Sequence, residues 1–452
     1  MKKPFCPLPW VMLATRNDGK VRLCAQSHSS PDKGVNRGDD GKIFTINQST
    51  LAELKNSNFM KSVRKEFLQG RFPESCGRCA KEVQAGLRSR PDYESANWQN
   101  FIDLEKARQL TRSDGHIESP IRFLDLRLGN LCNLKCRTCN PTESSSWYAD
   151  HVSVWGKSFK GFQGQKLRLH KEGSIWQVQG DSFCWGENEK IAPALKEALE
   201  TVELIHFSGG EPLLLKSHYK ILEFLKDIGR SGEVRLEYIT NLTVLPEKAL
   251  QLWQDFLDVR IGISIDGVGA VNDYVRYPSR WNQIESHMAI LDRWQRPESI
   301  WYALTLHAYN IFYLPELIEW RIHSPFLNIN NREPDPLFSV HPLHNPSFLN
   351  IQMLPSQVKS KVSQRLQSYL AKGSRDGRFD QTPYPYITTA AVEALVSGYI
   401  DFMNQQDQSS FFTKFIDYTD SLDKVRKQSM AEALPEFSQC LRQGSSFLDS
   451  RL

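Results

Sequence analysis

The segment RLGNLCNLKCRTCNP (residues 127–141) places Cys132, Cys136 and Cys139 at the spacing CxxxCxxC, directly after an apolar run. Thiolates are soft, charged ligands that suit zinc or an iron–sulfur cluster. Three thiolates leave one of the usual four positions open, and the segment holds no histidine to close the shell. The spacing predicts a metal centre with an open position, and from this segment alone a zinc knuckle stays an alternative.

From residue 121 onward, short apolar runs alternate with amphipathic stretches. This alternation predicts βαβ units and a parallel sheet whose strand ends carry the site. The expected strands are 121–129, 202–210, 234–241, 259–267 and 300–308, with FLNINN (326–331) as a sixth. The expected helices between them are 217–229, 246–258 and 283–295.

A second motif, HFSGGEPLL (residues 206–214), ends the strand expected after the cysteines. Gly209 and Gly210 permit close backbone approach and unusual dihedral angles at a strand end. Glu211 adds a carboxylate acceptor, which suits the ammonium group of a ligand. Alone this motif is compatible with a simple turn, but beside the cysteine triad it predicts a ligand site.

The triad and the GGE motif together resemble the radical S-adenosylmethionine (radical SAM) superfamily, over roughly residues 120–331. The resemblance implies an α/β fold with a partial (β/α)6 TIM-like barrel. It implies a four-iron four-sulfur (4Fe-4S) cluster on the triad, whose open iron binds S-adenosylmethionine (SAM). It also implies the reaction of an oxygen-sensitive enzyme: reductive cleavage of SAM to a 5′-deoxyadenosyl radical, which abstracts a hydrogen atom from a substrate.

The same resemblance implies a set of SAM-binding residues at the ends of the second, third and fourth strands. Glu211 would receive the amino group of SAM, and Arg276 would pair with its carboxylate. Asn241 and Asp266 have simpler alternatives, as a helix cap and as part of a turn. The full set is Gly209, Gly210, Glu211, Thr240, Asn241, Ser264, Asp266 and Arg276.

One position departs from the family pattern. The family has an aromatic residue just before the third cysteine, where it packs on the adenine of SAM, whereas this chain has Thr138. We therefore expect another group to hold the adenine, with Leu128, Leu306 or an aromatic residue from elsewhere as candidates.

A second set of cysteines lies in the N-terminal region, where FCPLPW, VRLC and CGRC contain Cys6, Cys24, Cys76 and Cys79. Four thiolates close a complete shell for zinc or for a second cluster, and spacing does not choose between them. The region resembles the twitch modules that carry auxiliary iron–sulfur clusters in radical SAM enzymes, in an N-terminal position. That resemblance implies an auxiliary cluster, of the 4Fe-4S type.

Four regions follow from these patterns. Residues 1–90 are expected to form the twitch-like module, with a hairpin turn at Asn17-Asp18-Gly19 and a helix over 50–69. Residues 91–119 would be a linker helix, and 120–335 the radical SAM barrel, with a Trp-rich insertion at 143–190 that is either a lid or a small subdomain. Residues 336–452 would form a mostly helical extension.

Composition limits the setting of the protein. Lys and Arg exceed Asp and Glu by only 56 to 52 among 452 residues, a balance that does not point to nucleic acid. The N-terminus lacks the apolar stretch of a secretory signal, and no membrane span is expected. We therefore expect a cytoplasmic protein, in which nine cysteines are metal ligands or reactive thiols rather than disulfides.

The substrate is less constrained than the radical chemistry. A peptide or natural-product precursor is the leading expectation, because auxiliary-cluster modules recur in enzymes that modify such substrates. A carbohydrate epimerase or dehydrogenase, an RNA-modifying enzyme and a non-catalytic zinc-stapled binding protein are the alternatives. A flavodoxin or ferredoxin would supply electrons, and Cys184 or Cys440 is a candidate hydrogen-atom donor, although a packed or surface thiol is the simpler interpretation of each.

Overall fold

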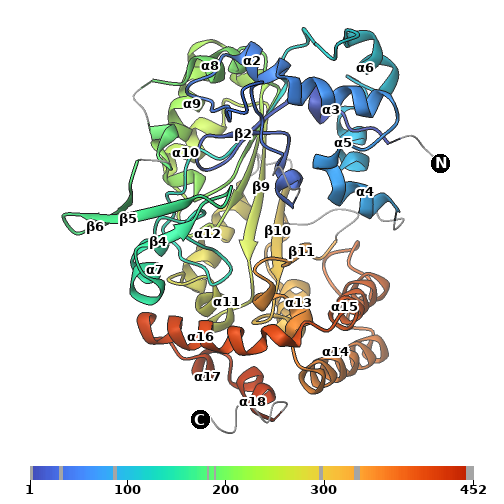
Figure 1. Ribbon diagram of the computed structural model, residues 1–452. Helices are drawn as coiled ribbons and strands as arrows, with labels where there is room; N and C mark the ends of the chain where they lie inside the picture. Colours follow the sequence, from blue (N-terminus) through green and yellow to red (C-terminus); the bar gives the residue numbers. More distant parts are fainter. Residues whose placement is uncertain are drawn as a thin grey trace.

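The computed structural model describes residues 4–29, 34–84, 89–180, 183–187, 190–294, 299–329 and 336–443. Its centre is an eight-stranded sheet in the order β11-β10-β9-β8-β7-β3-β1-β2 (Figure 1). All neighbouring strands are parallel except β1 and β2. The strands are β1 (Met12–Thr15), β2 (Val21–Arg22), β3 (Phe123–Leu126), β7 (Leu204–Phe207), β8 (Arg235–Thr240), β9 (Asp258–Ile265), β10 (Ser299–Leu306) and β11 (Ser339–Pro342).

The five strands expected between residues 121 and 308 are confirmed as β3, β7, β8, β9 and β10. Buried and partly exposed residues alternate strictly along β8 and β10. One face of these strands therefore packs in the core, and the other faces the interior of the barrel. The helices that follow the strands are α8 (Pro193–Leu199), α9 (Lys216–Asp227), α10 (Glu247–Trp253), α11 (Ala270–Val275), α12 (Trp281–Arg293) and α13 (Leu314–His323).

The sixth strand is not the one that the sequence suggested. Phe326 lies in the turn region after α13, where its ring packs against Trp320, and residues 330–331 lie outside the described residues. The sixth parallel strand is β11, which pairs with β10 from Ser339 to Pro342. Phe326 and Ile329 are buried in the main core without being part of a strand, which is why the apolar pattern was misleading.

The N-terminal hairpin is confirmed, but it does not stand apart from the barrel. Gly19 has φ +74° in the turn, and the Arg16 amide donates to the Lys20 carbonyl at 2.9 Å. β1 then pairs in parallel with β3, with Met12 opposite Phe123. The barrel sheet therefore continues into the N-terminal region, and the division expected at residue 90 stays a prediction.

The segment expected to be a linker helix contains two helices, α5 (Arg90–Trp98) and α6 (Leu104–Leu110). Side chains of α5, among them Glu94 and Trp98, line a cavity of about 510 Å³ together with inward side chains of β3, β7 and β8. His206 and Glu237 in this cavity share a hydrogen bond of 2.8 Å. Helix α5 therefore covers the inner face of the sheet rather than only joining two regions.

The described residues between 143 and 187 include a small unit with its own core. It contains α7 (Trp147–Trp155) and an antiparallel sheet of β4 (Ser158–Lys160), β5 (Lys166–Glu172) and β6 (Ile175–Val178). Tyr148, Phe159 and Leu169 are buried together between these elements. The β5–β6 hairpin projects from the body at the left of Figure 1.

The chain after β11 is helical within the described residues. Figure 1 shows α16 crossing below the barrel, next to α7. No helix in the described residues is long and apolar enough to cross a membrane. The C-terminal helices are α14 (Ser356–Asp376), α15 (Thr389–Asn404), α16 (Phe412–Arg426), α17 (Met430–Ala433) and α18 (Pro435–Gln443).

The helix expected over residues 50–69 is divided into α2 (Leu51–Asn56) and α3 (Asn58–Leu68). Ser57 separates them, with an extended ψ of 155° and a side chain that caps α3 by accepting from the Met60 amide. Such a hydroxyl cap satisfies one of the amides that a helix start leaves without a partner. Two further helices of this region are α1 (Leu8–Val11) and α4 (Gly77–Gln84).

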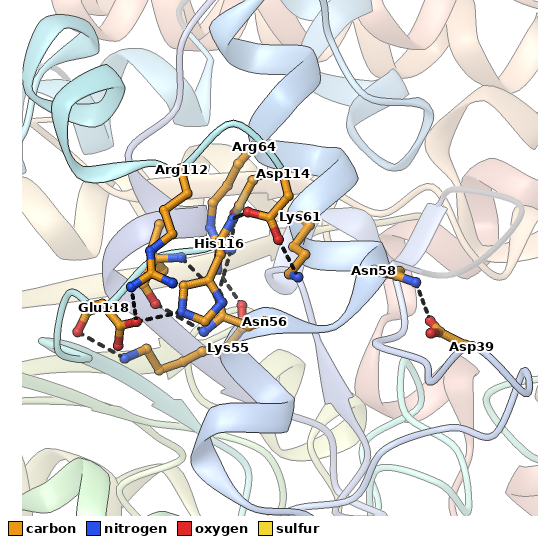
Figure 2. A network of polar contacts seen from close by, with 12 residues as sticks. Asp39, Lys55, Asn56, Asn58, Lys61, Arg64, Arg112, Asp114, His116 and Glu118 are labelled. Atoms are coloured by element: carbon orange, nitrogen blue, oxygen red, sulfur yellow. Dashed lines mark hydrogen bonds and ion pairs between the residues drawn. The ribbon is translucent and has the colours of Figure 1, made fainter.

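A polar network attaches α2 and α3 to the loop at residues 112–118 (Figure 2). The buried guanidinium of Arg64 donates to the carbonyls of Pro9, Lys55 and Gly115. Asn56 forms a pair of hydrogen bonds with the backbone of Ile117. One arginine thus holds three separate segments of the N-terminal region together.

We expect Arg64→Ala to destabilise the protein by about 2–4 kcal/mol, because it removes the donor of two buried hydrogen bonds and one partly buried hydrogen bond. This loss of stability is the difference between the free energies of unfolding in urea of the variant and of the unaltered protein. Lys65→Ala, on the exposed side of the same helix, is the control and should change the free energy of unfolding by less than about 0.5 kcal/mol. Equal effects of the two substitutions would show that the network does not carry this stability.

Candidate functional site

The cysteine loop follows β3, and its backbone is joined to the end of β7. The Glu211 amide donates to the Leu131 carbonyl at 2.8 Å. Gly210 has φ +50°, and a Cβ there would lie 2.4 Å from the same carbonyl. Only glycine permits this approach without displacing backbone, so the GGE motif is what allows the cysteine loop to lie against the second barrel strand.

The same loop is also joined to the segment that carries Arg276. The Lys135 amide donates to the Tyr277 carbonyl at 2.8 Å, and the Arg137 amide donates to the Val275 carbonyl at 2.7 Å. Two features predicted from distant parts of the sequence, the triad and Arg276, are therefore brought to one place by backbone hydrogen bonds.

The three thiols of the triad lie close to one another. The hydrogen bond between Cys136 and Cys139 lowers the pKa of Cys136 to about 7 and raises that of Cys139. Burial, and then the neighbouring Cys136, raise the pKa of Cys132 to about 12. The side-chain nitrogen Nδ2 of Asn241 lies 3.8 Å from the Cys132 sulfur and donates toward it. Buried thiols of this kind are costly to ionise unless a cation compensates them.

The donor set of the triad fits an iron–sulfur cluster. Each thiolate of a 4Fe-4S cluster binds a separate iron, so three cysteines hold three irons and leave the fourth iron open. The positive charges of Arg276 and Arg426 favour the Cys136 thiolate, as an anionic cluster requires.

Glu211 is buried and almost fully hydrogen-bonded. Its carboxylate accepts from the Thr240 hydroxyl at 2.8 Å, from the Asn241 amide at 2.8 Å and from the Leu213 amide at 3.2 Å. A carboxylate has about four acceptor positions, so one is left for a ligand donor. Burial raises the pKa of Glu211 to about 7. An ammonium group at this position would stabilise the ionised form.

The predicted roles of Thr240 and Asn241 become more specific. The Thr240 hydroxyl donates to Glu211 and accepts from the Leu242 amide, so Thr240 positions the carboxylate. Asn241 does not cap a helix, because α10 begins at Glu247. Its side-chain oxygen instead accepts from both the amide and the hydroxyl of Thr243, which leaves its amide nitrogen near the triad.

Asp266 and Arg276 form a buried ion pair at 2.9 Å. The Thr305 amide also donates to Asp266, which is fully buried. Arg276 and Ser264 line a cavity of about 870 Å³, to which Thr138 of the cysteine loop also contributes. These two residues, both predicted to bind SAM, therefore face an open volume beside the triad.

Leu128 and Leu306, the apolar candidates for holding an adenine, are packed in the main core. Neither lines the 870 Å³ cavity. The aromatic rings of its described lining are those of Phe162 and Trp301, together with two imidazoles. An aromatic residue from elsewhere in the chain is therefore the better-placed replacement for Thr138.

Nothing in the sequence indicated that the C-terminal helices support the cysteine loop. Arg137 of the loop is fully buried and forms an ion pair with Asp423 on α16. Asp150 on α7 links Lys135 of the loop at 2.6 Å to Arg426 of α16 at 2.7 Å. The two ion pairs with α16 connect residues that are separated in the sequence by 286 and 276 positions. In the sequence, only the buried charges of an otherwise amphipathic helix could have indicated these pairs.

The N-terminal cysteines also gather, around Cys24. Burial and the nearby Cys24 raise the pKa of Cys6, and the same two causes raise that of Cys79 to about 12. Cys76 ends the short turn that leads into α4, which contains Cys79. Arg90 stands near enough to favour the thiolates of Cys6 and Cys79. The auxiliary cluster expected on these four cysteines stays a prediction.

The two candidate hydrogen-atom donors lie elsewhere. Cys184 is exposed in the insertion, and Cys440 is buried in α18 among C-terminal helices. Neither lines the 870 Å³ cavity beside the triad. Their role as donors stays a prediction that this geometry does not support.

Residues 126–307 match the family model described as Radical SAM superfamily. The match spans the triad, Glu211 and Arg276. A comparison with curated proteins gives no match.

Similar solved structures include native anSMEcpe with bound AdoMet, at 14% identity, TM-score 0.34, and coverage of 57% of this chain and 63% of that one. SuiB from Streptococcus suis bound to S-adenosylmethionine is similar at 10% identity and TM-score 0.31, with coverage of 70% and 62%. SuiB bound to the precursor peptide SuiA gives 11% identity, TM-score 0.31 and coverage of 70% and 64%. The match covers less than two thirds of each of these chains.

We expect Gly210→Ala to destabilise the protein by about 1–3 kcal/mol more than Gly229→Ala. Both glycines have positive φ, but a Cβ at Gly229 meets open space, whereas one at Gly210 meets the Leu131 carbonyl. The difference therefore measures the close approach alone. Unfolding in urea gives the two free energies, and equal losses would show that the contact with Leu131 is dispensable.

Proposed function

We propose that this protein is a radical SAM enzyme that holds a 4Fe-4S cluster on Cys132, Cys136 and Cys139. The observation that carries the proposal is the hydrogen bond that docks the cysteine loop onto Gly210 and Glu211, inside the segment that matches the family. When bound, the cluster and SAM would supply a one-electron cleavage of SAM that leaves a carbon radical able to remove a hydrogen atom.

The residues of the chain position SAM in this scheme. Glu211, held by Thr240 and Asn241, accepts from the amino group with its remaining acceptor position. Arg276 donates to the carboxylate of SAM. To do so, it either leaves Asp266 or keeps that ion pair and uses its other donors. The buried braces at Arg137 and Asp150 keep the cysteine loop from moving when SAM binds.

A second cluster, on Cys6, Cys24, Cys76 and Cys79, completes the proposal. The grouping of Cys6 and Cys79 around Cys24, with Arg90 nearby, supports it. Four cysteine ligands leave no open iron, so its role is electron transfer or structural support rather than substrate binding. The N-terminal region would then be a twitch-type module, and a flavodoxin or ferredoxin of the cytoplasm would be the electron donor.

The substrate that we propose is a peptide or natural-product precursor, because modules with auxiliary clusters recur among enzymes of that kind. The 870 Å³ cavity is large enough for a side chain of such a substrate next to SAM. An oxidoreductase or epimerase outcome is equally compatible with hydrogen-atom abstraction.

Substituting all three triad cysteines with Ala should abolish the formation of 5′-deoxyadenosine from SAM and dithionite. The variant should keep about half of the iron, since two clusters of one type share it equally. The matched variant replaces the four N-terminal cysteines and should lose the other half. Iron and sulfide assays after anaerobic purification, with deoxyadenosine read by chromatography, give both results.

Two outcomes would contradict the proposal. Zinc in place of iron, with no deoxyadenosine from the unaltered protein, would exclude the radical enzyme. Full iron content in the variant that lacks the N-terminal cysteines would exclude the second cluster but leave the first intact.

SAM should bind more weakly as the pH falls below 7. The ligand-free Glu211 carboxyl has a pKa of about 7, above its ordinary range, so below that pH it must lose a proton before it accepts from an ammonium. The affinity should fall by about tenfold per pH unit between about pH 7 and 5. In Glu211→Gln the affinity should be lower at about pH 8 and flat across this range. Calorimetric titration with SAM at each pH measures these affinities. If the affinity of Glu211→Gln depends on pH as steeply as that of the unaltered protein, the pH dependence belongs to another group.

A further inference from the structure

The 870 Å³ cavity lies between the two cysteine sets. Thr138 and Asn140 of the cysteine loop line one side of it, and Ala25 and Arg78, which adjoin N-terminal cysteines, line another. Its described lining contains a single carboxylate, that of Glu143. The same lining contains six arginines, Arg16, Arg22, Arg78, Arg90, Arg127 and Arg276. A molecule that enters this cavity meets several guanidinium groups, and those without a carboxylate partner are the ones available to an anion.

Four of the six guanidinium groups have a carboxylate partner within the protein. Each of these pairs has a nitrogen–oxygen distance of 3.4 Å or less, so these arginines are largely neutralised where they stand. The pairs are Arg78–Glu82 at 2.8 Å, Arg90–Glu94 at 3.1 Å, Arg127–Glu143 at 3.4 Å and Arg276–Asp266 at 2.9 Å.

Arg22 differs from these four. It lies on β2, is 5% exposed, and its Nε and Nη2 are buried without a hydrogen-bond partner among the described residues. Burial and the neighbouring Arg127 disfavour its charge, whereas Asp125 on β3 and Cys24 favour it. A buried guanidinium with two vacant donors is costly, and the cost is offset when an anion accepts from them.

Two further guanidinium groups stand beside Arg22. Arg127, at the end of β3, also has a buried Nε without a partner, although its Nη1 contacts Glu143. Arg16, in the hairpin turn, lies with its guanidinium 5.2 Å from the centre of the Phe162 ring. The hairpin of β1 and β2 thus brings Arg16 and Arg22 close to Arg127, which follows β3.

We propose that Arg22, with Arg127 beside it, binds an oxyanion group, a phosphate or a carboxylate, of the molecule that enters this cavity. The planar fork of a guanidinium donates two parallel hydrogen bonds to such a group. Placed between the triad and the N-terminal cysteines, the bound anion orients the substrate toward SAM. This assignment of a substrate class rests on the proposed radical SAM function, whereas the anion site itself does not.

The test is a calorimetric titration of the full, anaerobically purified chain with inorganic phosphate and, separately, with succinate, at constant ionic strength in chloride. We expect saturable binding of one of the two probes, and the tighter probe identifies the anion as phosphate or carboxylate. Arg22→Gln should weaken that binding by about tenfold or more, as loss of a charge-assisted hydrogen-bonded pair requires. Arg22→Lys, which keeps the charge but loses the fork, should give an intermediate value.

The control is Arg122→Gln, an arginine at the opposite end of β3 that pairs with Glu203 and lies outside the cavity lining. It should leave the affinity within about twofold of the unaltered chain, because a distant surface charge is screened by salt. The thermal unfolding transition of Arg22→Gln, measured in chloride, reports whether this variant folds. If it does not fold, Arg127→Gln gives a second measure of the same site.

The result that overturns the proposal is unchanged affinity in a folded Arg22→Gln variant, or no saturable binding of either probe. Loss of iron from Arg22→Gln with unchanged anion binding would also overturn it, and would assign Arg22 to the N-terminal cysteines. Because the titration uses no reductant, it is independent of SAM cleavage. Anion binding without deoxyadenosine formation would therefore contradict only the proposed function, and the reverse would contradict only this inference.

Discussion

The hydrogen bond from the Glu211 amide to the Leu131 carbonyl, 2.8 Å long, fixes the cysteine loop against the end of the second barrel strand. It forms only because position 210 carries no side chain, since a Cβ would meet that carbonyl at 2.4 Å. With the loop in this place, the Cys132 sulfur lies 3.8 Å from the side-chain nitrogen Nδ2 of Asn241. The carboxylate of Glu211 is then positioned by the end of the third strand. One backbone contact thus relates the proposed cluster ligands to the carboxylate that we propose binds SAM.

A loop with so many charged and polar residues needs support that its own sequence does not contain. Arg137 is fully buried, and its charge is compensated by Asp423 from α16. Asp150, from the insertion, compensates both Lys135 and Arg426. Buried charges that lose a partner are strongly destabilising, so the insertion and the C-terminal helices hold the cysteine loop in one conformation. The regions outside the barrel are part of the site in this physical sense.

The N-terminal region contributes in a different way, by extending the sheet. Because β1 pairs with β3, the hairpin turn lies beside the site, where Asn17 donates to the Thr142 carbonyl at 3.0 Å and to Glu143 at 2.9 Å. The same hairpin places Arg22 in the cavity lining. A module attached only by a flexible linker could not place charged groups there. The place of Arg22 in the cavity lining is therefore a product of the sheet extension.

The sequence by itself determined the local features: the order of strands and helices between residues 121 and 308, the triad and the glycines before Glu211. These follow from periodicity, ligand chemistry and the conformational freedom of glycine, which all act over a few residues. The tertiary structure alone decided which strand is sixth, because only the observed pairing places Ser339–Pro342 beside β10. It also decided that β1 joins the sheet, that Asp423 pairs with the cysteine loop and that Arg22 lines the cavity. Pairing between strands and compensation of buried charge depend on partners far away in the chain, which no local pattern encodes.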